Sequence, residues 1–241
     1  MPAKRTKQIP WRRVATTGAV AIAVILLLPY AVAPFYRVID PVSMPMLWRK
    51  LTGERVVHIK VPLDRISPEL RLAVIVAEDG SFCRNPGIDL GELREALKSG
   101  HRLDVVRGAS TITQQTVKNL FLWPGRSYVR KALETPLALW LNLVLPKQRI
   151  LEIYFNIAEW GPNGEFGAEA GARFAFHKSA ADLDDREAAE LAAILPNPAR
   201  RSARLPGPLV RRLADLYQRR AEAHPALDAC IRSPDAGSTR P

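Results

Sequence analysis

Cysteine is scarce in this sequence and follows no metal-binding pattern. The two cysteines, Cys83 and Cys230, lie far apart and form no Cys-x-x-Cys pair. Such pairs are typical of zinc sites and dithiol redox motifs, so the sequence predicts neither. One disulfide is possible if the domain lies outside the cytoplasm, and two unpaired buried thiols are an equal alternative. The sequence therefore leaves the pairing open.

Acidic residues are also in short supply. The 241-residue chain has 24 Asp and Glu against 35 Lys and Arg, which gives a formal net charge of +11 and a pI near 10.1. This excess indicates a polyanionic partner: nucleic acid, an anionic membrane surface or a phosphorylated substrate. The hydrophobic fraction of 47% is ordinary for a protein with a packed core, so a mostly disordered chain is not expected.

Charge of either sign is absent from residues 14–36. A helix of about 20 residues crosses the roughly 30 Å hydrocarbon layer of a bilayer, so this stretch predicts a transmembrane helix. Residues 1–13 are basic and contain no acid, which predicts a cytoplasmic tail and places the chain after about residue 37 on the outer side. That location disfavours nucleic acid as the partner.

The main alternative for this stretch is a cleaved signal peptide. The apolar region of a signal peptide is shorter, near 7–15 residues, and an Ala-x-Ala-like site follows it. The sequence AVA at 31–33 fits such a site weakly. A buried core helix is less favoured still, because no charged residue interrupts the run.

Beyond the apolar stretch, the sequence predicts a neck and one mainly α domain. Residues 37–66 contain three prolines and a β-prone run, ERVVHIKV, which is expected to be a strand or simply the neck. From Pro68 onward apolar residues recur at helical spacing, and we find no alternation of strands and no repeat. The domain is expected over 67–225 and a disordered tail over 226–241. Helices are predicted from Pro68 and over 111–122, 127–145, 146–160, 184–195 and 211–223, with Pro136 and Pro146 as kinks or boundaries.

The first polar cluster is AEDGSFCRNPGID, residues 77–89. An apolar helix runs directly into Glu78 and Asp79, so a carboxylate lies at the edge of a core. Partial desolvation there can raise the pKa of a glutamate toward the value that a general acid or base needs. Two solvated acids at a helix C-terminus are the alternative, although the helix dipole disfavours them there.

A second cluster, RGASTITQQTVKNLF, covers residues 107–121. Ser110, Thr111 and Thr113 can cap a helix start, where exposed N–H groups favour anions. On composition alone, a capped helix with a polar outer face is favoured. The following polar residues are Gln114, Gln115, Lys118 and Asn119.

A third cluster, GRSYVRKALE at 125–134, is basic and contains one acid. Arg126, Arg130 and Lys131 precede Glu134, which stands four residues after Arg130. A salt-bridged surface helix is the favoured interpretation of this pattern alone.

The order of these segments resembles the family 51 glycosyltransferases, the peptidoglycan polymerases that occur alone or joined to a penicillin-binding transpeptidase. The pattern is ED-x-x-F, G-x-STITQQ-x-x-KN, RK-x-x-E, K-x-x-ILE-x-Y-x-N and LPNP, between about Val74 and Pro198. Residues 156–180 resemble the monofunctional members in particular. The absence of a Ser-x-x-Lys motif agrees, because a transpeptidase needs that serine nucleophile.

The resemblance implies a mostly helical, lysozyme-like domain with a cleft and a hydrophobic lobe that dips into the membrane. The implied activity is inverting polymerisation of lipid II into β-1,4-linked strands, with release of undecaprenyl pyrophosphate. Glu78 matches the family's general base, which takes the proton from the 4-hydroxyl of the acceptor. Asp79 would orient the site. The base is needed because an alcohol is a poor nucleophile until its proton is removed.

The resemblance also implies groups that contact the leaving pyrophosphate. Lys118 and Arg126 match phosphate-contacting cations, and Glu134 matches a second essential glutamate near the pyrophosphate. A divalent cation, Mg²⁺ or Mn²⁺, is a candidate cofactor but not an obligatory one. Further substrate contacts are expected from Ser110, Gln114, Gln115, Asn119, Arg130 and Lys131, whereas Lys147, Glu152, Tyr154 and Asn156 match a fourth motif that is mostly architectural.

The implied partners are lipid II, the growing glycan chain and membrane lipids, and not nucleic acid. Other cell-wall synthesis or division proteins are candidate partners. The implied location is the bacterial inner membrane, with a single span and the catalytic domain outside the cytoplasm.

The chain departs from the family pattern in two places. The first motif usually has a histidine where this chain has Asn85, which can form hydrogen bonds but cannot titrate. Pro136 and Asn142 are expected to break the helix after RK-x-x-E. Neither departure touches Glu78 or Glu134, so we expect an active enzyme.

Two other functions fit parts of the pattern. A lysozyme-like lytic enzyme would use one catalytic glutamate but would not need the basic cluster, since its substrate has no pyrophosphate. A non-catalytic, membrane-anchored scaffold would not need Glu78 and Glu134, and both are present.

Overall fold

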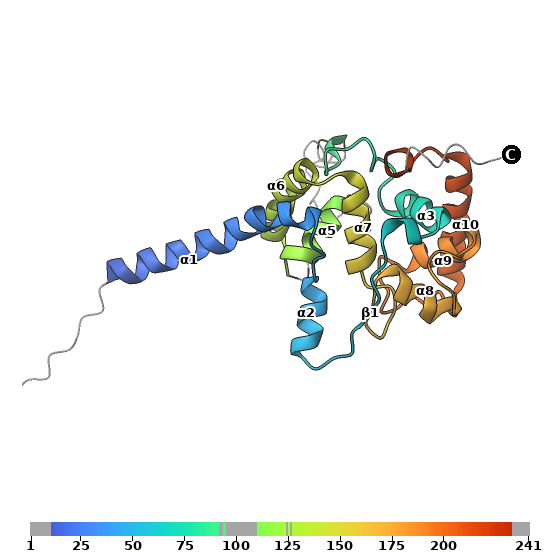
Figure 1. The fold of residues 1–241 in the computed structure, drawn as a ribbon, viewed down its shortest axis with the longest axis horizontal. Coiled ribbons are helices and arrows are strands. Elements are labelled where there is room, and N and C mark those ends of the chain that lie inside the picture. The colour runs from blue at the N-terminus through green and yellow to red at the C-terminus, as the bar shows by residue number, and fades with distance from the viewer. Residues whose placement is uncertain (1–10, 92–93, 95–109, 124, 126, 233–241) are drawn as a thin grey trace, which may run out of the picture.

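The computed structural model describes residues 11–91, 94, 110–123, 125 and 127–232 (Figure 1). The chain is mainly α, as predicted. In the part that is described, strands form a single parallel pair, β1 (Val57–His58) with β2 (Glu165–Phe166). β1 falls inside the β-prone run of the neck.

The N-terminal helix α1 (Trp11–Val32) extends away from the rest of the molecule and continues into the 3-10 helix η1 (Ala33–Arg37) (Figure 1). Together they form an apolar helix of 27 residues, in which an 18-residue window has a mean hydropathy of 2.2 and is little buried. The predicted span, 14–36, lies inside it. By length and composition the helix can cross a bilayer, and a signal sequence would satisfy the same criteria.

Residues 37–66, expected as a neck, are folded onto the domain. Helix α2 (Met44–Leu51) is capped by Ser43, whose hydroxyl accepts from Met46 N at 3.3 Å. Met46 is buried in the core, whereas Trp48 on the same helix is exposed. β1 and the short 3-10 helix η2 (Leu63–Arg65) follow. The segment therefore contributes to the hydrophobic core and does not merely link the span to it.

Two groups of helices build the domain. In one, α3 (Pro68–Glu78) packs with α9 (Asp185–Ile194) and α10 (Pro208–Ala223); in the other, α5 (Ile112–Phe121) packs with α6 (Tyr128–Val144) and α7 (Lys147–Ile157). Helix α8 (Ala168–Phe176) joins the two groups through α7 and α9. The first group lies at the end of the molecule opposite α1 (Figure 1).

The helix boundaries follow local capping chemistry. Ser67 accepts from Leu70 N at 3.1 Å, and Thr111 and Asp184 each form a capping box with the residue three positions on. Pro146 is the N-cap of α7, as the predicted boundary there requires.

The expected break at Pro136 and Asn142 is wrong, because α6 runs through both residues. Proline removes one backbone donor and disfavours a helix interior. Leu137, Ala138 and Leu141 are all buried, so the packing of this face against the core holds the helix together across the proline.

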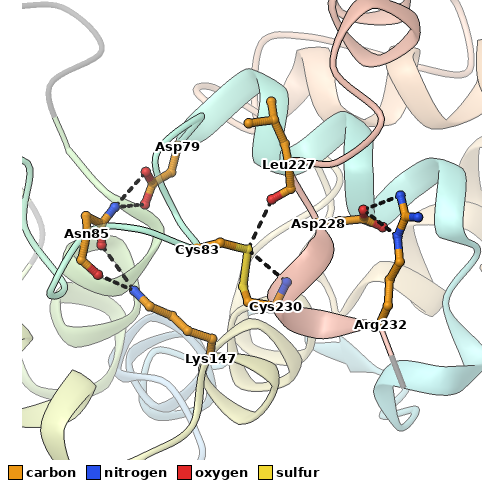
Figure 2. Close-up of a disulfide and its surroundings, with 8 residues drawn as sticks. All are labelled: Asp79, Cys83, Asn85, Lys147, Leu227, Asp228, Cys230 and Arg232. Atoms are coloured by element: carbon orange, nitrogen blue, oxygen red, sulfur yellow. Dashed lines mark hydrogen bonds and ion pairs between the residues drawn. A yellow bond between two sulfur atoms is a disulfide. The ribbon is translucent and has the colours of Figure 1, made fainter. Parts of the chain in front are cut away.

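The expectation of a disordered tail from residue 226 is wrong for residues 226–232. Residues 226–232 are folded and include the 3-10 helix η3 (Ala229–Ile231), with Ile231 buried. Cys230 forms a disulfide with Cys83 in the loop after α3, which settles the pairing that the sequence leaves open (Figure 2). Sequence spacing gave no sign of this bond, since the two cysteines are 147 residues apart.

Loss of the disulfide is expected to destabilise the fold. The bond closes a loop of 147 residues, and a cross-link of this kind typically contributes about 2–4 kcal/mol by constraining the unfolded chain. We therefore expect reduction, or the Cys83→Ser/Cys230→Ser double change, to lower the melting temperature of the detergent-solubilised chain. The double variant serves as the control for the reductant, to which it should not respond. Equal melting of the oxidised and reduced parent would contradict this expectation.

Candidate active site

Glu78 is the last residue of α3, and its half-buried side chain lines a cavity. Gln115 Nε2, from α5, donates a hydrogen bond to Glu78 Oε2 at 2.7 Å. Burial raises the pKa of Glu78, while the Gln115 hydrogen bond and the charges of Lys118 and Arg201 act in the opposite direction. A desolvated carboxyl that is still hydrogen-bonded is suited to accept a proton.

Asp79, which follows, is the centre of a buried network (Figure 2). Asn85 Nδ2 donates to both carboxylate oxygens of Asp79, at 2.9 and 3.1 Å. Lys147 Nζ donates in turn to Asn85 O at 2.9 Å and to Asn85 Oδ1 at 3.1 Å. Asn85 therefore connects a cation to a carboxylate without titrating itself.

The pKa values of both ends of this network are shifted. Burial raises the pKa of Asp79, and the Asn85 hydrogen bond is the largest of the contacts that lower it. Burial lowers the pKa of Lys147 to about 8, although the charge of Asp79 acts against that change. Each charge thus partly compensates for the desolvation of the other.

The same carboxylate fixes the start of α5. Asp79 Oδ2 accepts a hydrogen bond from Ile112 N at 3.1 Å, and the Thr111 hydroxyl donates to Gly87 O at 2.6 Å. Gln114 Oε1 accepts from Thr111 N at 3.1 Å and completes the capping box. Gln114, expected as a substrate contact, is buried in this cap. The cap and Asp79 together hold α5, and with it Gln115, beside Glu78.

Gly87 allows this loop to lie directly against α6. Its φ is +103°, and a Cβ there would lie 2.6 Å from Ala138 O. A side chain at this position would be strained and would also collide with the backbone of α6.

A second charged cluster lies on α6. Glu134 is 3% exposed and pairs with Arg130 (Nη1 to Oε1, 2.8 Å) and with Lys131 (Nζ to Oε2, 3.5 Å). Lys131 Nζ also donates to Ser110 Oγ at 3.0 Å. The ion pairs that the sequence suggests do form, but Glu134 is buried and not on an exposed face.

Lys118 on α5 lies within electrostatic reach of both glutamates. Burial lowers its pKa, and the charges of Glu134 and Glu78 oppose that shift. In the part of the chain that the structure describes, the ammonium group of Lys118 has no hydrogen bond or ion pair with a protein group. Its ammonium group is therefore available to a ligand.

Two cavities lie near the start and the end of α5. The first, of about 370 Å³, contains the carboxyl groups of α3 and its loop, and we call it the carboxylate cavity. The second, of about 390 Å³, contains cations of α5 and α6, and we call it the cation cavity. The carboxylate cavity is lined by Val76, Ala77, Glu78, Asp79, Gly80, Ser81, Asp89, Ser110, Thr111 and Arg220. The cation cavity is lined by Pro45, Lys118, Asn119, Leu122, Trp123, Gly125 and Arg130.

The fourth motif holds the domain together, as expected. Asn156 Oδ1 accepts from Val61 N at 2.9 Å, and Glu152 Oε2 accepts from Leu63 N at 3.0 Å, so both tie α7 to the neck segment. The hydroxyl of buried Tyr154 donates to Gln115 Oε1 at 3.3 Å, which orients the amide that contacts Glu78. Lys147 belongs to the network around Asp79.

Most of the sequence-predicted site residues are brought to these two cavities. Arg126 lies outside the described residues. Arg220, which lines the carboxylate cavity, was not among the candidates, because α10 follows the matching motifs and its arginines resemble any solvated basic helix. Among the described residues, no group of three or more His, Cys, Asp or Glu side chains is arranged to hold a metal ion.

Comparison with known proteins gives consistent matches. A family model described as Transglycosylase matches residues 46–221. A protein of Nitrobacter hamburgensis named "Biosynthetic peptidoglycan transglycosylase" is 56% identical over 94% of this chain and 100% of its own length. Proteins with the same name from Nitrobacter winogradskyi and Rhodopseudomonas palustris are 56% and 55% identical, over 88% and 92% of this chain and 94% and 92% of their own lengths.

The burial of Glu78 is expected to cost stability near neutral pH. Because its pKa is raised in the folded state, the folded chain holds this proton more tightly than the unfolded chain does. Stability from this group is thus present at low pH and is lost as pH rises through the folded pKa. Glu78→Gln, which keeps a hydrogen-bonding side chain without the charge, should melt at a higher temperature than the parent at pH 7.

The gain should shrink as the pH is lowered toward the ordinary pKa of a glutamate. Melting curves of both proteins between pH 4 and pH 8 would check this. A gain that stays constant over that range would show that charge burial is not its cause.

Proposed function

Since this chain belongs to the transglycosylase family of peptidoglycan glycosyltransferases, we propose that it polymerises lipid II with Glu78 as the general base. The reaction joins disaccharide units into β-1,4-linked glycan strands for the bacterial cell wall. The observation that carries the proposal is the presence of a half-buried, hydrogen-bonded carboxyl near the start of α5 and of a separate cation cavity near its end.

The carboxylate cavity supplies the base. Glu78 takes the proton from the 4-hydroxyl of the acceptor lipid II, and the oxygen attacks the anomeric carbon of the growing chain from the face opposite the leaving group. The new C–O bond forms as the bond to the pyrophosphate breaks, which inverts the anomeric centre. Burial raises the pKa of Glu78, so its carboxylate is a stronger base than a solvated one, and Gln115 holds it in position.

The cation cavity receives the leaving group. Lys118, with no protein partner among the described residues, and Arg130 face the space in which the pyrophosphate develops charge. Fixed cations in a partly desolvated site can contribute several kcal/mol to transition-state stabilisation. Glu134 holds Arg130 and Lys131 in place, and from the sequence pattern Arg126 is a further candidate contact.

The substrate enters from the membrane side. Pro45 on α2 and the half-exposed Trp123 line the cation cavity, and Leu47 and Trp48, which follow Pro45 on α2, are exposed as well. An exposed apolar surface of this kind marks a membrane contact. The lipid tail of the donor would thus leave the cation cavity toward the bilayer while its sugars extend toward Glu78.

We also propose that α1 is a permanent single membrane span with the catalytic domain on the outer side. The residues around the weak cleavage site belong to the fold: Ala33 is 1% exposed, and Trp140 Nε1 donates to Tyr30 O at 3.0 Å. Arg149 Nε donates to Tyr36 O at 2.7 Å. Cleavage after residue 33 would remove packed residues from the domain. A disulfide in the domain is compatible with an oxidising compartment.

The alternative functions are less well supported. A lytic enzyme needs one catalytic carboxyl but has no use for Lys118 and Arg130 in a separate cavity. A scaffold has no use for a desolvated Glu78, whose burial works against the stability of the fold. Other cell-wall synthesis and division proteins remain candidate partners.

Removal of the base should abolish polymerisation. Glu78→Gln keeps the size and the hydrogen bond of the side chain but cannot accept the proton, and loss of a general base typically costs about 10²–10⁴-fold in rate. Glu134→Gln should also reduce the rate strongly, because Arg130 and Lys131 lose the charge that positions them. The measurement is the formation of glycan chains from labelled lipid II in detergent.

Glu69→Gln is the matched control, since Glu69 stands in the first turn of the same helix, away from both cavities. It should retain the parent's rate. Glycan chains formed at the parent's rate by Glu78→Gln would refute the assignment of the base.

The acid limb of the pH–rate profile should respond to Gln115. Activity needs ionised Glu78, so kcat/KM falls as the pH drops through its pKa. The Gln115 hydrogen bond lowers that pKa, so Gln115→Ala should raise it and move the acid limb to higher pH. The exposed Gln148→Ala is the control and should leave the limb in place. An unmoved limb in the Gln115 variant would mean that another group titrates.

A further inference from the structure

Residues 200–220 form the most basic part of the folded domain. They include seven arginines and a single acid, Asp215, which pairs with Arg186 of α9. None of the seven has a carboxylate partner within the described part of the chain. We call this segment the arginine face; its arginines are Arg200, Arg201, Arg204, Arg211, Arg212, Arg219 and Arg220.

The arginine face is at the wrong end of the molecule to lie on the membrane. Helix α10 packs on α3 and α9, and this group lies opposite α1 along the long axis of the molecule (Figure 1). A basic helix beside the anchor could contact anionic lipid, but one at the far end of the domain would be directed away from it. The anion that this face meets must therefore reach it through the active site or from the space beyond the membrane.

Arg220 connects this face to the active site. Val210, Ala214 and Tyr217 form the buried side of α10, and Arg220 lies on the flank of that side, where it lines the carboxylate cavity. Arg212, Arg219 and Arg220 are all exposed, but of these three only Arg220 lines the cavity. Among the described residues that line this cavity, Arg220 is the one cation.

A second arginine, Arg201, also lies close to the base. Arg201 is half-buried, and its Nη1 donates to Ala193 O near the end of α9 at 2.8 Å. The charge of Arg201 acts on Glu78, and the charges of both Arg201 and Arg220 act on buried Tyr217. The two guanidinium groups thus lie around the same stretch of α10, next to the base.

The chemistry of the glycan strand indicates which anion Arg220 would bind. With the pyrophosphate in the cation cavity, the carboxylate cavity holds the sugars near the reaction centre, and the strand continues away from the membrane. There, the anionic groups of a newly made strand are the carboxylates of the peptides attached to its sugars. Guanidinium groups bind carboxylates with charge-assisted hydrogen bonds.

We propose that Arg220, supported by Arg201, binds a peptide carboxylate of the glycan strand as the strand leaves the carboxylate cavity. This role rests on the proposed polymerase function and adds to it a contact for the part of the substrate that does not react. It makes Arg220 a substrate-binding residue that acts on KM and on strand length and not on the chemical step.

The test compares Arg220→Ala with Arg212→Ala on two substrates. One is ordinary lipid II, and the other is lipid II in which the peptide carboxylates are converted to amides. An exposed charge pair corresponds to about a two- to fivefold change in affinity, so Arg220→Ala should raise KM for ordinary lipid II by about that factor, with kcat nearly unchanged and shorter strands. Arg212→Ala removes the same charge from the same helix and should match the parent.

The amidated substrate decides what Arg220 recognises. On amidated lipid II, the parent should show the same increase in KM that Arg220→Ala shows on ordinary lipid II. Arg220→Ala should not raise the KM for the amidated substrate any further. An equal loss by Arg220→Ala on both substrates would mean that the arginine senses pyrophosphate or anionic lipid, which overturns the proposal. An Arg220→Ala variant with the same KM and strand length as Arg212→Ala would also overturn the proposal. If either of these results is obtained while the parent still forms polymer, the polymerase function stands and only the role of Arg220 is refuted. If the parent forms no polymer, both the polymerase function and the role of Arg220 are refuted.

Discussion

The carboxylate of Asp79 holds the active site together. It accepts hydrogen bonds from Asn85, from the Ser81 hydroxyl and from the backbone N–H of Ile112, and so joins the loop after α3 to the start of α5. Through Asn85 it also reaches Lys147 at the start of α7. A buried carboxylate is costly unless its oxygens are satisfied, and here several donors offset that cost. Because the network ends α3 and begins α5, the base on one helix and its supporting amide on the other are held in register.

The site places its base and most of its cations near opposite ends of α5. Glu78 and Asp79 line one cavity together with Arg220, Lys118 and Arg130 line the other, and Lys118 is influenced by both glutamates. A transfer that takes a proton from an alcohol and releases a pyrophosphate needs a base at one place and positive charge at another. A base next to free cations would lose basicity, since nearby positive charge lowers its pKa. The charges of Lys118 and Arg201 act on Glu78 in this way, and its burial offsets them.

Asn85 departs from the family pattern, which usually has a histidine there, but it still forms hydrogen bonds that hold the loop in place. A histidine there could change its charge with pH, whereas an asparagine offers a permanent donor to Asp79 and a permanent acceptor to Lys147. The disulfide acts on the same loop, because Cys83 lies two residues before Asn85 and is bonded to η3 (Figure 2). The loop that positions the site is therefore held from two sides, by the Asp79 network and by the C-terminal segment.

The sequence by itself determined the helical class, the apolar span and the motifs, since these depend on local properties: periodicity, capping residues and spacing along the chain. The helix over 111–122 could be predicted because its cap is encoded in neighbouring residues. Contacts between distant segments could not. Only the tertiary structure decided that α6 continues through Pro136, that Cys83 meets Cys230, and that Arg220 reaches the cavity of Glu78. Each of these depends on packing between elements far apart in the chain, and no local pattern records it.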